Sequence, residues 1–393
     1  KKEGSILGIG SRIIPMSKDV LDKFGSGQSH SQTAERTGYR GTRRLYQRDN
    51  LRRERIHRVL KILDFIPEHY LNAIDFKNKP GKFYNDKEVK LTYQPANNNT
   101  VLRYEFIFMD SFFEMLTEFK EKHPELFYKK PNGEETKIPY DWTIYYLRKK
   151  ALKEKITEQE LAWIILNFNQ KRGYYQLRGE EETDNTKTEE FYSLIVADIQ
   201  ETEDKNANGT WYNVILENGW VYRRQSKDSL ENWKGKTKEF IITTQLDENG
   251  NPKTDKEGDI KRSFRAVDSE KDWIAIKKKT EQDIDISGKT VGQYIYESIL
   301  KNPKQKIRGK LVKTIERKFY KDELKQILEK QVQLHQKLQD KKLYKACVEE
   351  LYHRNEEYKK SIINKGFVYL FIDDIIGSTT NLMENNKLAA KKS

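Results

Sequence analysis

Residues 36–61 hold ten lysines and arginines but only two acidic residues. On a helix of 100° per residue, Leu45, Ile56, Leu60 and Leu63 fall within one narrow stripe. The pattern predicts a helix from Thr42, which serves as N-cap, to Ile66, with Pro67 ending it. Only Arg53 among the arginines lies clearly outside the opposite half of this helix. The eight arginines that cover that half are Arg36, Arg40, Arg43, Arg44, Arg48, Arg52, Arg55 and Arg58.

This excess of arginine favours phosphate binding over plain solvation. A helix that only faces water usually alternates glutamate with lysine four residues apart, and such a solvated helix is the alternative interpretation. Arginine instead suits bidentate contact with phosphate. Residues 301–318 add eight basic residues against one acidic residue, so these two segments account for more than the whole net charge of +13. Charge clustered in this way is typical of a protein that binds a nucleic-acid backbone.

Composition limits the class of protein. The chain has 393 residues, which corresponds to two or three domains, and its 11% aromatic content indicates folded modules. Its single cysteine, Cys347, excludes an internal disulfide and a cysteine-based zinc cage. No apolar stretch is long enough to span a membrane and no signal peptide opens the sequence, so we expect a soluble, cytoplasmic protein.

Apolar periodicity predicts a mainly α fold with a small antiparallel β module (α+β). Thr157 and Glu160 form a capping box before a helix that stops at Gly173. Asn218-Gly219 predicts a type I′ hairpin turn, and residues 249–252 predict a second turn. Helices are expected at 103–122, 142–153, 157–172, 291–300, 322–338 and 344–362, and strands at 6–9, 12–14, 194–199, 211–216, 220–224, 239–245, 264–267, 273–276 and 367–376, with a linker at 23–33.

These elements divide the chain into six parts. Residues 1–35 are expected to hold strands and a linker, and residues 36–66 the arginine-rich helix. The other parts are a helical region at 67–185, a β-rich insertion at 186–285, a second helical region at 286–370, and a strand with a polar tail at 371–393.

The sequence shows no self-contained active site. Its six histidines form no HExxH motif, and there is no P-loop and no dinucleotide-binding motif. Cys347 and His353 are the closest pair of possible metal ligands, and we interpret them as structural residues. Asp373 and Asp374, as neighbours on a strand, would point to opposite faces, and we interpret at least one as a solvated charge or a cap. We therefore assign no catalytic residue and no metal ligand.

Three segments, in this order and spacing, resemble the type II CRISPR RNA-guided DNA endonucleases, and more narrowly their II-C-like branch. Residues 36–58, which begin Arg36-Thr37-Gly38-Tyr39-Arg40, resemble the bridge helix of that family, and the strand Arg12-Ile13-Ile14-Pro15 before it resembles the family's post-strand linker. Residues 143–148 with 161–163 and 171–174 are similar to its recognition lobe. So are residues 290–294 with 307–309 and 317–320.

The resemblance implies a multi-helix recognition lobe led by a bridge helix that holds guide RNA (crRNA with tracrRNA) and its heteroduplex with target DNA, as a monomer within a ribonucleoprotein of a bacterial antiviral defence system. Tyr39, Tyr174 and Tyr175 are candidates for stacking or packing. The expected phosphate-binding residues are Arg36, Arg40, Arg43, Arg44, Arg48, Arg52, Arg55, Arg58, Lys171, Arg172, Arg178, Arg308, Lys313, Arg317 and Lys318.

The chain also departs from the family pattern. The nuclease segments expected before Ile6 and after Ile376 do not occur, so we expect no cleavage by this chain and no cofactor in it, with magnesium belonging to the parent nuclease. The alternative is a non-enzymatic architectural protein that binds RNA or DNA. A metal nuclease complete within the chain is excluded by the missing ligands.

Overall fold

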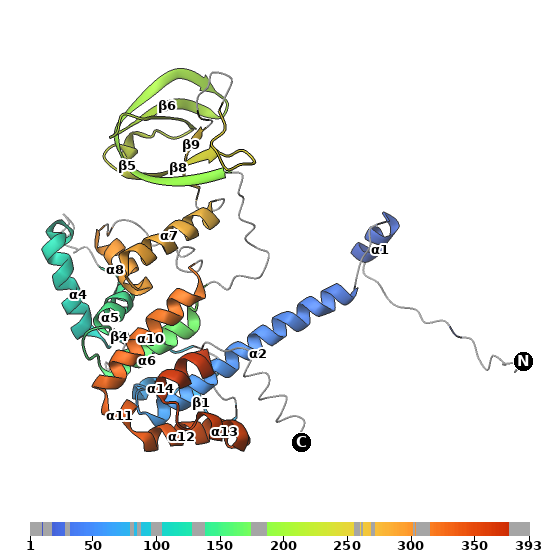
Figure 1. The fold of residues 1–393 in the computed structure, drawn as a ribbon, viewed down its shortest axis with the longest axis vertical. Coiled ribbons are helices and arrows are strands. Elements are labelled where there is room, and N and C mark those ends of the chain that lie inside the picture. The colour runs from blue at the N-terminus through green and yellow to red at the C-terminus, as the bar shows by residue number, and fades with distance from the viewer. Residues whose placement is uncertain are drawn as a thin grey trace, which may run out of the picture.

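The computed structural model describes residues 10, 18–27, 32–78, 82–84, 88–95, 104–127, 138–173, 187–254, 260, 262–268, 272–301, 303 and 315–376. It shows a helical body, a β module, and one long helix that projects from the body (Figure 1). The fold is therefore α+β, as the sequence predicted. The strands expected at 6–9 and 12–14 lie outside the described residues.

The projecting helix is α2 (Gln32–Ile62), which begins ten residues before the expected N-cap Thr42. It runs through Gly38 and Gly41, which weakened the sequence prediction, and α1 (Lys18–Gly25) occupies part of the expected linker. The helix ends before Pro67. Asp64 takes a positive φ of 58°, and the amides of Asp64 and Phe65 donate to the carbonyls of Lys61 and Leu60. This is a Schellman motif, with aspartate in the left-handed position that glycine usually fills.

The helical body contains α3 (Glu68–Leu71), α4 (Met109–Lys122), α5 (Thr143–Lys150), α6 (Glu158–Gln170), α7 (Trp273–Ser287), α8 (Val291–Lys301), α10 (Arg317–Leu334), α11 (Gln336–Gln339), α12 (Lys341–Tyr352), α13 (Glu356–Ile362), α14 (Phe367–Tyr369) and the π-helical η4 (Leu370–Ile376). Short hairpins pair β1 (Ile74–Asp75) with β2 (Lys82–Phe83), and β3 (Tyr93–Pro95) with β4 (Tyr104–Phe106). The capping box is confirmed, because Thr157 and Glu160 bond reciprocally at the start of α6. One hydrophobic core joins these helices and includes Ile56, Leu60 and Leu63 at the end of α2.

A buried ion pair fixes three of the body helices. Arg148 of α5 donates to Glu323 of α10 through Nε at 2.9 Å and Nη2 at 2.5 Å. The same carboxylate accepts the amide of Gly292 in α8 at 3.0 and 3.1 Å. The guanidinium of Arg148 also lies 4.5 Å from the ring centroid of Phe168 in α6. Residues from the second and third resembling segments therefore meet in one buried cluster.

The β module is a five-stranded antiparallel sheet in the order β7-β6-β5-β8-β9. Its strands are β5 (Lys187–Asn206), β6 (Gly209–Leu216), β7 (Val221–Ser226), β8 (Thr237–Gln245) and β9 (Arg262–Ala266). Two irregularities in β5, between Val196 and Asp198 and between Glu201 and Lys205, let this long strand curve. A second, smaller hydrophobic core fills the module.

Several local predictions are wrong. Residues 273–276 begin helix α7, and residues 367–376 form α14 and η4, because short apolar runs do not distinguish strands from buried helices. Residues 344–362 form two helices, α12 and α13. The Asn218-Gly219 hairpin exists, but only Gly219 has a positive φ; the amide of Gly219 donates to Leu216 in a three-residue loop, so the turn is not type I′.

The turn expected at residues 249–252 is confirmed, since Asp247 accepts from the amides of Asn249 and Asn251. Among the helices of the described segments, none is long and apolar enough to pass through a membrane.

Candidate nucleic-acid interface

In the first half of α2, all residues from Arg36 to Gln47 are exposed. Figure 1 shows it extending away from the helical body, and Arg36, Arg40, Arg43 and Arg44 are all exposed there. Leu45, expected in the apolar stripe, is 57% exposed, and Tyr39 and Tyr46 are 64% and 67% exposed. A helix that buries no side chain gains little from tertiary packing. Its arginines are thus available to a partner that follows the helix.

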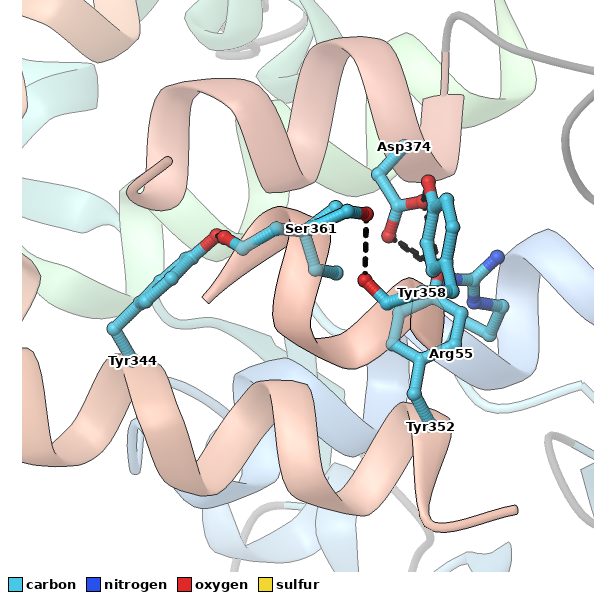
Figure 2. Close-up of polar contacts among 7 residues, drawn as sticks. Arg55, Tyr344, Tyr352, Tyr358, Ser361 and Asp374 are labelled. Atoms are coloured by element: carbon cyan, nitrogen blue, oxygen red, sulfur yellow. Dashed lines mark hydrogen bonds and ion pairs between the residues drawn. The ribbon is translucent and has the colours of Figure 1, made fainter. Parts of the chain in front are cut away.

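The second half of α2 is instead held by the protein. Arg55 is buried, and its Nη2 donates to Asp374 Oδ2 of η4 at 2.9 Å and also contacts the hydroxyl of Tyr352. The hydroxyls of Tyr352 and Tyr358 donate to the same carboxylate at 2.5 to 2.7 Å (Figure 2). Burial lowers the pKa of Arg55 and raises that of Asp374, while the partner's charge opposes each shift. Arg55 therefore does not face solvent, which corrects the expected position of this arginine, and of the two neighbouring carboxylates Asp373 is the exposed one and Asp374 the buried one.

Other arginines of this half also contact carboxylates. Arg58 donates to Glu54 at 3.0 Å and to Glu350 of α12, and Arg53 bonds Glu88 at 2.9 Å. Burial alone would lower the pKa of Arg58, but its hydrogen bonds to Glu350 and Glu54 raise it. The expected continuous row of arginines therefore divides into an exposed part at 36–44 and a part anchored in the body.

A cluster of four arginines lies where these parts meet. Arg48 and Arg52 come from α2, Arg172 follows α6, and Arg317 begins α10. We call these four residues the arginine cluster. Asp49 bonds Arg52, and it accepts from Arg172 Nη2 at 3.1 Å. The three resembling segments thus contribute to one positively charged site, in which Asp49 bonds two of the four arginines.

The cluster carries an electrostatic cost. Burial, and then repulsion from Arg52 and Arg317, lowers the pKa of Arg172 to about 10. The pKa of Arg52 is also lowered, by burial first and then by Arg317 and Arg48, although Asp49 opposes the shift. In the described structure the buried Nε and Nη1 of Arg52 and Nη1 of Arg172 have no hydrogen-bond acceptor. Buried donors of this kind are normally satisfied, and an anion could accept from each of these three nitrogens.

A cleft of about 600 Å³ opens beside the cluster. Its wall includes Asp49, Arg53, Lys90, Lys171 and Arg172. Lys171 is exposed at the C-cap of α6. Lys90 was not anticipated, because a single lysine in an irregular segment gives no pattern in the sequence. The cleft therefore brings Lys90 and Lys171 near the cluster, in a wall that also contains Glu88 and Asp141.

The remaining expected contacts have different positions. Lys318 is exposed and lies 4.9 Å from the ring centroid of Phe319. Arg317 is half-buried in a small cavity it shares with Arg172. Tyr174, Tyr175, Arg178, Arg308 and Lys313 lie outside the described residues.

A magnesium ion would need a group of oxygen ligands. Within the described residues no three His, Cys, Asp or Glu side chains gather as a metal site would require. The neighbouring pair Asp373 and Asp374 is engaged elsewhere, since Asp373 bonds Lys321 at 2.8 Å and Asp374 bonds Arg55. Cys347 is buried, which raises its pKa to about 12, and His353 is exposed. No catalytic step is derived from these groups.

The fold and this site define a helical protein with an arginine-rich face suited to nucleic-acid phosphates. Residues 36–70 match the family model described as the bridge helix of CRISPR-associated endonuclease Cas9. The match supports a Cas9-like protein with a CRISPR-associated, nucleic-acid-binding role. Comparison with curated protein sequences gives no match.

Proposed function

We propose that this chain is the guide-RNA-binding part of a CRISPR RNA-guided DNA endonuclease of type II, II-C-like, comprising its bridge helix and recognition lobe. The observation that carries the proposal is the arginine cluster, which brings together four arginines from three segments, two of them bonded to Asp49, and in which repulsion from Arg52 and Arg317 helps to lower the pKa of Arg172. A phosphate at this place would supply the missing acceptors and relieve the repulsion that lowers the pKa of Arg172.

The exposed half of α2 extends this interface. Arg36, Arg40 and Arg44 recur at four-residue spacing, so they lie along one face of the helix. An RNA strand that follows this face would place successive phosphates against successive turns and reach the cluster. In this proposal the protein reads backbone and shape, while base pairing with the guide selects the target DNA. Cleavage, and the magnesium it needs, would belong to the nuclease segments of the parent protein.

The test compares RNA with DNA over a range of salt. A structured RNA with repeat:anti-repeat pairing and a B-form DNA duplex of equal length are titrated with the chain at several NaCl concentrations. We expect tighter binding to the RNA and a steep fall of affinity with salt, because bound phosphates release counterions. The double variant Arg43→Ala/Arg44→Ala should reduce the salt slope by about two units, one for each lost contact.

Arg354→Ala is the matched control, because Arg354 is an exposed arginine between α12 and α13, outside the arginine cluster. It should leave the slope unchanged. Equal affinity for RNA and duplex DNA would refute the guide-RNA assignment and favour the architectural RNA- or DNA-binding alternative. Equal loss in Arg354→Ala and in the double variant would show that α2 is not the binding surface.

A further inference from the structure

The β module lies outside the arginine cluster, and its strand order can be compared with that of a known nucleic-acid-binding barrel. The first strand of the module, β5, pairs with both β6 and β8, and the order β7-β6-β5-β8-β9 places the third and fifth strands at the two ends. This is the order of the five-stranded OB barrel, in which the first strand is long and curved and the third approaches the fifth.

Side chains across the two ends bring the barrel close to closure. Phe264 of β9 lies 5.9 Å, ring centroid to centroid, from Tyr222 of β7, and 5.5 Å from Trp220 beside β7. An OB barrel carries a helix between its third and fourth strands, and here η3 (Glu231–Trp233) occupies that place, with Leu230 buried in the core of the module. The contacts between the two end strands and the position of η3 between β7 and β8 both support the OB topology.

In OB barrels the face of the second and third strands binds oligonucleotides or oligosaccharides. The corresponding strands here are β6 and β7, and their outer face carries Trp211, Asn213, Arg223 and Gln225. The inner-facing residues of β6, including Tyr212 and Val214, are buried in the module core. All positions of both strands belong to the described structure.

An aromatic ring and a guanidinium stack on this outer face. The guanidinium carbon of Arg223 lies 5.0 Å from the ring centroid of Trp211, and the Arg223 side chain is 56% exposed. Gln225 is the register partner of Trp211 in the neighbouring strand, and its side-chain amide donates to the carbonyl of Gly209 at 3.0 Å. A planar ring, a planar cation and amide side chains are the groups with which proteins stack and hydrogen-bond unpaired bases.

We propose that the outer face of β6 and β7 binds an unpaired stretch of RNA, with bases stacking on Trp211 and Arg223. This site is separate from the arginine cluster and does not require it. Its carboxylates already have partners, since Asp204 bonds Arg223 and Asp198 bonds Lys234 at 2.6 Å. The surface is therefore close to neutral, and its affinity should depend on stacking and only weakly on salt.

The test uses the full chain and a fluorescein-labelled ten-nucleotide oligouridylate, with anisotropy measured at about 0.5 M NaCl, where phosphate contacts are weakened. Trp211→Ala should weaken binding by about five- to hundredfold, the range expected for one lost base stack. Trp211→Phe keeps a ring and should retain affinity within about threefold. Far-ultraviolet circular dichroism and urea unfolding show that each variant keeps its fold.

Phe113→Ala is the matched control, because Phe113 is a 55% exposed aromatic residue of α4, outside the β module. Its affinity should equal that of the parent chain. Unchanged binding by Trp211→Ala, or an equal loss in Phe113→Ala, would overturn the proposal. The Arg43→Ala/Arg44→Ala variant should bind the oligonucleotide normally at high salt, so failure of this site and failure of the phosphate interface give different results.

Discussion

Arg55 donates to Asp374 across 2.9 Å, joining two residues that are 319 positions apart in the sequence. Figure 2 shows the hydroxyls of Tyr352 and Tyr358 directed at the same carboxylate. One arginine of an arginine-rich helix is thus used to fix that helix to the end of the helical body. The pair is one of the contacts that hold the second half of α2 against the body, together with Ile56, Leu60 and Leu63 in the core.

Asp374→Asn should lower the free energy of unfolding by about 3 kcal/mol. The substitution keeps the shape of the side chain but leaves the buried guanidinium of Arg55 without a countercharge, which is costly. Urea unfolding followed by circular dichroism measures the change. A loss below about 1 kcal/mol would contradict the role of the pair.

Asp373→Asn is the control for this experiment. Asp373 is the adjacent carboxylate and pairs with Lys321, but both side chains are more than 40% exposed. An exposed ion pair contributes roughly 0 to 1 kcal/mol, so this variant should unfold near the midpoint of the parent chain.

The Arg55–Asp374 pair also shows what the sequence could reveal. Periodicity predicted a helix at residues 42–66 and its apolar residues, and Ile56, Leu60 and Leu63 are indeed buried. It could not show that Arg55 is covered by η4, because the covering residues lie at the other end of the described chain. It also missed the exposure of Leu45, since a stripe on a helical wheel does not reveal where the packing surface ends.

His57 predicts how stability depends on pH. It is fully buried in α2, and burial, followed by repulsion from Arg53, lowers its pKa to about 3. The unfolded chain, with an ordinary pKa near 6.5, therefore binds a proton that the folded chain does not. Between pH 6.5 and about 3, stability should fall as pH decreases, by up to about 1.4 kcal/mol per pH unit from this residue.

Urea unfolding at pH 7, 6 and 5 measures this slope. His57→Gln should flatten it while keeping a polar group near Tyr70, whose hydroxyl lies 3.1 Å from His57 Nε2. Part of the slope should persist, because burial also lowers the pKa of His335. His69→Gln is the control, since His69 is only partly buried. An unchanged slope in His57→Gln would contradict the neutral, buried state of His57.

Gly292→Ala should destabilise the helical body. A Cβ at this position would lie 2.8 Å from Arg148 Nε and 2.9 Å from Arg148 Cβ, and it would also press on the carboxylate of Glu323. Both side chains are buried, so relief requires breaking part of the ion pair that joins α5, α8 and α10. We expect a loss of about 1 to 3 kcal/mol, measured by thermal and urea unfolding.

Gly38→Ala provides the comparison, because Gly38 lies on the exposed part of α2, where an added Cβ would meet nothing within 4 Å. Alanine should stabilise that helix slightly, by up to about 1 kcal/mol. The sequence showed both glycines within motifs. Only the packing distinguishes a glycine that a neighbour requires from one that weakens its own helix.

Asp49→Asn should separate binding from stability. Asp49 is the carboxylate bonded to Arg52 and Arg172, and its side chain is 58% exposed. Removing its charge should raise affinity for structured RNA several-fold at about 50 mM NaCl and less at about 300 mM, because the added attraction is screened. The Arg52 guanidinium is buried, so losing this partner should cost about 1 to 3 kcal/mol of stability while RNA affinity rises. Asp285→Asn, on the exposed side of α7, gives the same charge change away from the cluster and should alter neither quantity. If Asp49→Asn weakened RNA binding while the fold remained intact, Asp49 would have to be positioning the arginines for the phosphate rather than competing with it.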